Sequence, residues 1–125
     1  MQRNTRQRKA IEQVLEGATR PLTTDEILKK ARLTVPGLGL ATVYRALNAL
    51  QGDSRIVAVD IPGQSSRYEK AGLKHHHHFL CTKCQKVFEL PGCSYSGHGD
   101  SSLPNGFKLE GHEVILFGQC RSCAK

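Results

Sequence analysis

The sequence KHHHHFLCTKC, residues 74–84, sets four consecutive histidines directly before two cysteines at C-x-x-C spacing. A second C-x-x-C pair follows much later in the chain. Two thiolates of one tight turn can bind the same ion, and two such pairs supply the ligands of a closed tetrahedral zinc site. A closed site leaves no position for an activated water, which argues against catalysis there. We therefore predict structural Zn2+ bound by Cys81, Cys84, Cys120 and Cys123.

The histidine run leads into FLC, and KVFEL follows after the TKCQ turn, so we expect two neighbouring strands. Alternate side chains of a strand face opposite sides, which places His76 and His78 on one face and His75 and His77 on the other. Imidazole suits zinc, iron, nickel or copper. The run therefore predicts ligands for two separate ions, with a solvated polar strand as the alternative. Further candidate ligands are Glu69, Glu89 and His112.

The composition favours a protein that works in the cytoplasm and binds a polyanion. No apolar run approaches the roughly 20 residues of a membrane helix, and the N-terminus lacks the apolar segment of a secretory signal, so we expect no membrane contact. In a reducing compartment thiols stay reduced, so the five cysteines favour metal binding, with disulfides as the alternative. A net charge of +7 favours a phosphate-bearing partner, although many basic surfaces are merely solvated.

The first half of the chain predicts three helices followed by a hairpin. Thr5 could cap a helix from about residue 6 to residue 16, and TTDE, residues 23–26, has the capping-box pattern that starts a second helix. TVPGLG interrupts the chain before ATVYRALNAL, residues 41–50, which has helical apolar spacing. RIVAVDI and RYEK, separated by PGQSS, are typical of a hairpin. Together these elements predict a winged helix-turn-helix, with a small solvated helical domain as the alternative.

Polar residues near the start of the third helix are of the kinds that bind phosphates and base edges in a major groove. Cations at the N-terminal end of the first helix oppose the helix dipole, so binding to an anionic partner explains them better than helix stability does. A frayed, solvated terminus is the alternative. The candidate DNA contacts are Thr42, Tyr44, Arg45 and Asn48 in the third helix, and Arg3, Arg6 and Arg8 in the first.

Several phrases, taken in order, resemble the ferric uptake regulator (Fur) family of bacterial metal-dependent transcription factors: GLATVYRALNAL, RYEKAGLKHHHHFLCTKC, KVFEL and GFKLEGHEVILFGQCRSC. The resemblance implies an α+β protein that is not an enzyme. Residues 1–68 would form a winged-helix DNA-binding domain, residues 69–74 a hinge, and residues 75–125 a metal-binding α/β dimerisation domain stapled by the four-cysteine zinc site. It also implies a homodimer that binds AT-rich inverted repeats in double-stranded DNA, usually as a repressor of metal-uptake or stress genes.

The resemblance also assigns roles to residues. The four cysteines would hold structural zinc. Glu69, His76, His78 and Glu89 fall on the family's regulatory site, which would take Fe2+ or Zn2+, with Mn2+ and Ni2+ as further candidates. His75, His77 and His112 fall on a second site. Tyr44 and Arg45 fall on major-groove contacts, and Arg3 lies near a minor-groove one.

This chain departs from the family pattern at both predicted regulatory sites. Arg20-Pro21 stands where a histidine ligand often precedes the second helix, so Glu69 becomes the main tether between the domains. Ser96 stands at the usual acidic ligand of the second site, in PGCSYSGHGDSSLPNG, which is too rich in Gly, Pro and Ser for a long helix. Cys93 and His98 are the candidate substitutes.

Three other functions stay open from the sequence. Within the family, the alternative is a peroxide sensor whose histidines are oxidised. Outside it, the chain could be a metal-insensitive zinc-ribbon module that binds nucleic acid. A metal-dependent hydrolase or deaminase would need a general acid or base beside an open metal position, and no such motif occurs in the sequence.

Overall fold

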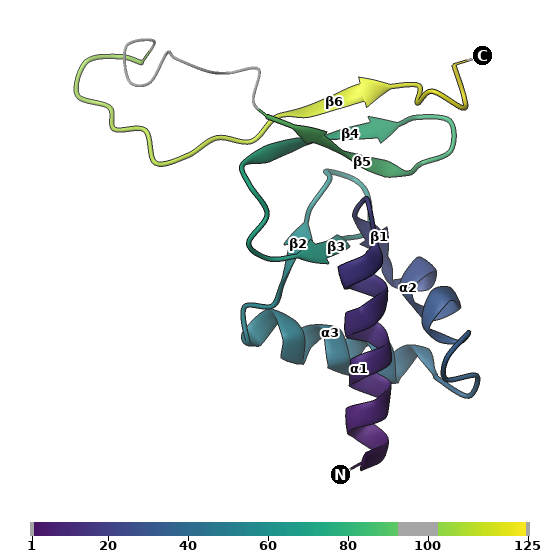
Figure 1. Ribbon diagram of the computed structural model, residues 1–125. Helices are drawn as coiled ribbons and strands as arrows, with labels where there is room; N and C mark the ends of the chain where they lie inside the picture. The colour runs from purple at the N-terminus through teal and green to yellow at the C-terminus, as the bar shows by residue number, and fades with distance from the viewer. Residues whose placement is uncertain (1, 93–102, 125) are drawn as a thin grey trace. The chain divides into compact units, whose positions relative to one another are not determined.

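The computed structural model describes residues 2–92 and 103–124, with side chains from residue 6 onward. The chain forms two compact units, Met1–Leu73 and Lys74–Lys125. The first unit contains α1 (Gln2–Gly17), β1 (Leu22–Thr23), α2 (Thr24–Ala31), α3 (Leu40–Gly52), β2 (Ile56–Val59) and β3 (Arg67–Lys70) (Figure 1). The second contains β4 (His76–Cys81), β5 (Val87–Pro91) and β6 (Ile115–Gly118). None of the described helices is both long and apolar enough to cross a membrane.

Helix α1 begins earlier than predicted. The expected start near Arg6 with a Thr5 cap is wrong, because the helix begins at Gln2 and Thr5 lies inside it. Gln and Arg have good helix propensity, so the upstream residues continue the helix rather than end it. The apolar stripe of α1 is as expected, since Ile11 and Leu15 are almost fully buried.

The capping box of α2 is confirmed. The Glu26 amide donates to the Thr23 hydroxyl at 3.2 Å, and the Thr23 amide donates to the Glu26 carboxylate at 3.0 Å. Arg20 adds a two-pronged ion pair to the same carboxylate, with distances of 3.3 and 2.5 Å. Arg20, from the Arg20-Pro21 pair at which the resemblance implies a histidine, therefore reinforces the start of α2.

Helix α3 supplies much of the core of the first unit. Its predicted apolar positions are all buried, and they pack with Ile11 of α1 and Ile27 of α2. In contrast to α2, its N-cap is Gly39 and makes no side-chain cap hydrogen bond. The first amides of α3 consequently lack the acceptor that a Ser, Thr or Asp cap would provide. The buried positions of α3 are Val43, Ala46, Leu47 and Leu50.

The predicted hairpin is confirmed as an antiparallel pair, β2 with β3, in which Val57 lies opposite Glu69. The sheet order is β1-β3-β2. The two-residue strand β1 was not predicted, because two residues are too few to show an alternating pattern.

The second unit is a three-stranded sheet in the order β5-β4-β6. The strands predicted on either side of the TKCQ turn are confirmed as the antiparallel pair β4 and β5. Strand β6 lies parallel to β4, with His78 opposite Ile115 and Cys81 opposite Gly118. A Cβ added at Gly118 would lie 3.0 Å from the Phe79 ring, so this close approach favours glycine.

The second unit buries little apolar surface. Among its described residues, the buried apolar side chains are Leu80, Cys81 and Val87. The resemblance implied an α/β domain, but residues 74–92 and 103–124 form strands and turns without a helix. A unit with so small a core needs another source of stability, such as a bound metal.

Candidate metal centres and nucleic-acid interface

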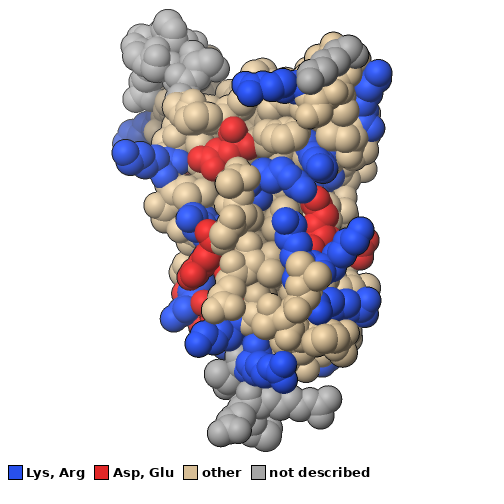
Figure 2. Space-filling model, turned by 45° about the vertical axis from the view of Figure 1, so that its right-hand side comes forward, with Lys and Arg blue, Asp and Glu red and all other residues tan. Residues whose placement is uncertain are grey.

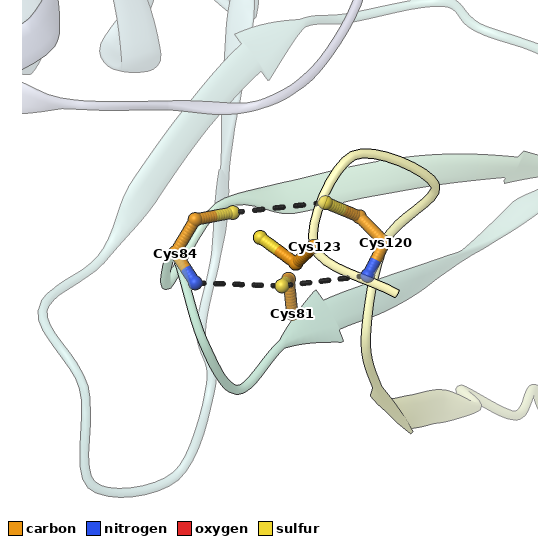
Figure 3. A group of neighbouring side chains, drawn as sticks. All are labelled: Cys81, Cys84, Cys120 and Cys123. Atoms are coloured by element: carbon orange, nitrogen blue, oxygen red, sulfur yellow. Dashed lines mark hydrogen bonds between the residues drawn. The ribbon is translucent and has the colours of Figure 1, made fainter. Parts of the chain in front are cut away.

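The four predicted zinc ligands converge from two turns, one after β4 and one after β6 (Figure 3). Their sulfur atoms all lie within 4.8 Å of one another, and the Sγ atoms of Cys84 and Cys120 are 3.9 Å apart. All four are free cysteines, which excludes a disulfide among them. Cys81 is fully buried, whereas Cys84 is exposed.

The cluster fits a zinc ion. With Zn–S bonds of about 2.3 Å, the sulfur atoms of a tetrahedral site stand about 3.8 Å apart, close to the observed separation of Cys84 and Cys120. Backbone amides also prepare the site, since the N–H groups of Cys84 and Cys120 each donate to the Cys81 sulfur at 3.4 Å. These residues would hold the zinc and supply the thiolates that bind it.

The amide donors affect the protonation of the cysteines. Hydrogen bonds from the Cys84 and Cys120 amides lower the pKa of Cys81 to about 6, which favours its thiolate. Hydrogen bonds with the sulfur atoms of Cys120 and Cys81 raise the pKa of Cys123 to about 12 in the metal-free cluster. Cys81 is therefore prepared to bind metal as a thiolate.

The odd-numbered histidines form one cluster, as the alternation of the strand predicts. His75, His77 and His112 each offer a ring nitrogen within 4.8 Å of the others. The Nε2 atoms of His75 and His77 are 3.2 Å apart, while the Nδ1 atom of His77 accepts the Val114 amide at 3.1 Å. Burial is the main cause that lowers the pKa of His77, and the neighbouring imidazoles lower it further. Burial therefore favours the neutral form of His77.

The even-numbered histidines lie together on the other face of β4. The ring centroids of His76 and His78 are 4.9 Å apart. Glu89 lies directly opposite His78 on β5 and so shares its face. Among the described residues, however, no cluster of three or more metal ligands includes the Glu89 carboxylate. Glu69 lies on β3 in the first unit, opposite Val57.

Backbone groups contact both histidine faces, and sequence reasoning missed them. The Lys74 carbonyl lies 2.7 Å from His76 Nδ1, and the Val114 amide lies against His77. No sequence signal could have identified these contacts, because every residue carries the same backbone groups. Cys93, Ser96 and His98 lie outside the described residues, as does the side chain of Arg3.

The candidate DNA contacts of α3 are accessible. Tyr44 is 47% exposed, and Arg45 and Asn48 are also exposed. Arg45 donates to the hydroxyl of half-buried Thr42 at 3.1 Å, which holds its guanidinium near the start of the helix. Because the N-terminal amides of α3 lack a side-chain cap, this end of the helix suits a phosphate.

The arginines of α1 have different surroundings. Arg8 pairs with Asp53, at the end of α3, and lies 3.9 Å from Glu12, which also pairs with Arg55 at 2.6 Å. Arg6 donates to the Thr34 carbonyl at 3.4 Å. Figure 2 shows basic side chains spread over the face in view, with fewer acidic ones among them, so the charges of this face do not by themselves mark out a DNA-binding surface.

Comparisons with known proteins agree with this arrangement. The Ferric uptake regulator family is matched over residues 2–117. The ferric uptake regulation protein of Campylobacter jejuni is 30% identical over 122 residues, covering 95% of this chain and 78% of that protein. The Helicobacter pylori ferric uptake regulator, whose structure reveals three functional metal binding sites, matches with a TM-score of 0.81 and 27% identity, covering 95% of this chain and 80% of that one.

A further solved structure, the Campylobacter jejuni peroxide stress regulator, matches with a TM-score of 0.66 and 25% identity, covering 97% of this chain and 91% of that one. Ferric uptake regulators are dimeric DNA-binding proteins that control transcription in response to metal, and they are not enzymes. Because the family match spans nearly the whole sequence and the Campylobacter jejuni relative aligns along most of its own length, this chain belongs to the ferric uptake regulator family.

Proposed function

We propose that this protein is a homodimeric, metal-dependent repressor of metal-uptake or stress genes that binds an AT-rich inverted repeat. In this proposal residues 1–68 form a winged-helix DNA-binding domain, residues 69–74 a hinge and residues 75–125 the dimerisation domain. The observation that carries the proposal is the separation of two histidine clusters on opposite faces of β4, next to the four-cysteine cluster. Ligand sets of this kind are typical of a protein that responds to a metal ion.

The proposed DNA-reading element is α3, whose N-terminal half would enter the major groove. Support comes from the exposure of Tyr44, Arg45 and Asn48 and from the uncapped start of the helix. Arg3 and Arg6 remain candidates for contacts outside the major groove. Arg8 is a weaker candidate, because its guanidinium already pairs with Asp53 and Glu12.

The proposed regulatory ion, Fe2+ or Zn2+, would be held by His76, His78 and Glu89 together with Glu69 of the other unit. Such an ion would restrict the hinge and hold the two winged helices of a dimer at the spacing of successive major grooves. Without it, DNA binding must itself order the hinge and is weaker. The second site would use His75, His77 and His112, with Cys93 or His98 as a further ligand.

Glu69→Ala should remove most of the metal-dependent gain in DNA affinity. Loss of one tether lets the hinge move, and couplings of this type typically correspond to about 5- to 150-fold in affinity. The measurement is fluorescence anisotropy of an AT-rich inverted-repeat duplex, with Fe2+ or Zn2+ and with chelator, at constant salt. Glu110→Ala, also a loss of one carboxylate, is the matched control because Glu110 is exposed and lies in neither histidine cluster.

Zinc content in the same experiment separates regulatory from structural metal. Both variants should keep one tightly bound zinc per chain. If the unmodified protein binds DNA equally with and without added metal, the proposed mechanism is wrong and the zinc-ribbon alternative gains support.

Arg45→Ala should weaken discrimination at one base position by about 1 to 3 kcal/mol. Arg8→Ala is the matched control and should change specificity much less, because Arg8 is engaged in ion pairs within the unit. Affinities for a set of single-base operator variants measure both effects. A uniform loss across all operators for Arg45→Ala would make Arg45 a phosphate contact instead.

Peroxide sensing is the second candidate function, and the likeness to a peroxide stress regulator favours it. A sensor loaded with Fe2+ would gain oxygen on a histidine after exposure to peroxide. Mass spectrometry of the peptide that contains residues 75–78 tests this directly. Absence of the added oxygen would leave the metal-uptake repressor as the supported function.

A further inference from the structure

The side chain of Arg45 is held by a hydroxyl rather than by a carboxylate. Its Nη2 atom donates to the Oγ1 atom of Thr42 at 3.1 Å. The two residues are three positions apart on α3, and helical side chains lean towards the N-terminus, so Arg45 lies over the turn that carries Thr42. The contact therefore restricts the direction of a long side chain that is otherwise exposed.

This partner leaves the charge of Arg45 available to DNA. Within the part of the chain that the structure describes, Arg45 forms no ion pair, and the first turn of α3 carries no acidic residue. A carboxylate partner would neutralise the guanidinium and repel a phosphate. A hydroxyl orients the same group without cancelling its charge. The arginines that do pair with carboxylates are Arg8, Arg20 and Arg55.

One donor edge of the guanidinium stays complete in this contact. A guanidinium has five N–H groups and two edges that can each donate two parallel hydrogen bonds, and Nη2 contributes one hydrogen to each edge. The bond to Thr42 uses one of these hydrogens, so the edge that carries the other remains intact. Guanine offers two acceptors, O6 and N7, in the major groove, and an arginine edge fits both. Adenine has a donor, N6, where guanine has O6, so the same edge disfavours adenine.

Holding Arg45 before DNA arrives should sharpen this choice of base. A freely moving arginine must be ordered on binding, which costs about 2- to 10-fold in affinity. A mobile guanidinium can also turn from a wrong base to a nearby phosphate, and this reduces the penalty for a mismatch. A guanidinium whose direction is already restricted lacks that freedom.

We propose that Thr42 is a positioning residue that orients Arg45 towards a guanine, so that both residues determine base preference although only Arg45 touches the base. The inference changes the role expected for Thr42 from a DNA contact to the support of one. Thr42 suits this role because its shorter side chain is half-buried, whereas Arg45 is exposed. The inference rests on the proposed DNA-binding function, but the motion of Arg45 is also measured without DNA.

Thr42→Val tests the orientation, because valine has the same branched shape and lacks the hydroxyl. Thr42→Ser restores the hydroxyl, and Thr19→Val is the matched control, since Thr19 is exposed and lies outside α3. In the full chain without DNA, nitrogen-15 relaxation of the Arg45 side chain should show more motion in Thr42→Val than in the other proteins. The amides of α3 should keep their exchange protection in every variant, which separates loss of the hydroxyl from unfolding. Equal motion of Arg45 in Thr42→Val and in the unmodified protein would overturn the proposal.

Affinities for single-base variants of the inverted-repeat operator test the consequence for DNA. Thr42→Val should lower discrimination by about 2- to 10-fold at the one position that Arg45→Ala affects, and that position should be a G·C pair. Thr42→Ser and Thr19→Val should retain the discrimination. Combined with Arg45→Ala, Thr42→Val should have no further effect, because its role passes through Arg45.

Three results of the operator series would overturn the proposal: unchanged discrimination in Thr42→Val, a uniform loss over all operators, or an effect that adds to that of Arg45→Ala. An additive effect would mean that Thr42 contacts DNA itself. An unmodified protein that binds all operators equally would overturn the proposed DNA-reading function together with this inference. A protein that discriminates among operators and in which Thr42→Val changes nothing would overturn this inference alone.

Discussion

Cys84→Ser will remove the structural zinc and unfold most of the second unit. A structural zinc site contributes an apparent binding free energy of about 10 to 16 kcal/mol in small zinc-finger peptides. The described part of this unit offers only three buried apolar side chains in compensation. We expect zinc content to fall by one ion per chain and the amides of β4, β5 and β6 to lose exchange protection. Those of α1, α2 and α3 should keep it, because they belong to the other compact unit.

Lys83→Ser is the matched control, since it introduces the same residue one position away on an exposed side chain. It leaves all four sulfur ligands and the backbone of the turn in place. Metal analysis with amide exchange of both variants measures the effect. A Cys84→Ser protein that loses zinc yet keeps a protected β4 would show that the strands, rather than the metal, hold this unit together.

Leu47→Ala should destabilise the first unit by about 2 to 5 kcal/mol, the usual cost of truncating a fully buried leucine. Leu47 is 1% exposed and packs in the core shared by α1, α2 and α3. Leu33→Ala is the control, because Leu33 is 86% exposed and its truncation should cost less than about 0.5 kcal/mol. All described helices lie in this unit, so the helical circular dichroism signal during urea unfolding reports on it. Equal unfolding midpoints for the two variants would contradict this account of the core.

The sequence predicted elements whose pattern is local. TTDE identifies the start of α2 because the capping box involves only Thr23 and Glu26. The helical spacing of the apolar residues in α3 identifies its buried side. The alternating direction of side chains along β4 separates the histidines into two pairs. The cysteine spacing predicts the composition of the four-sulfur cluster, which the structure brings together.

Other features depend on contacts between distant residues or on backbone groups. The ion pair between Arg8 and Asp53 joins α1 to the end of α3, and no local sequence pattern indicates that these two residues pair. The start of α1 was misplaced because Thr5 is compatible with both a cap and a helix interior. His76 and His77 are the same residue type, yet the Lys74 carbonyl contacts one ring and the Val114 amide the other, a difference that the sequence does not indicate.

The parallel pairing of β4 with β6 connects the two kinds of site in the second unit. Cys81 stands opposite Gly118 at one end of this pair, and His78 stands opposite Ile115 at the other. A slip of one residue would reverse which side of the sheet each side chain of β6 faces, and it would carry Val114 away from His77. A zinc ion bound by the four cysteines would therefore fix the register of β4 and β6, and with it the alignment on which the histidine cluster depends. One ion at the cysteine end would then both stabilise the unit and determine which residues meet at the other end of the strand.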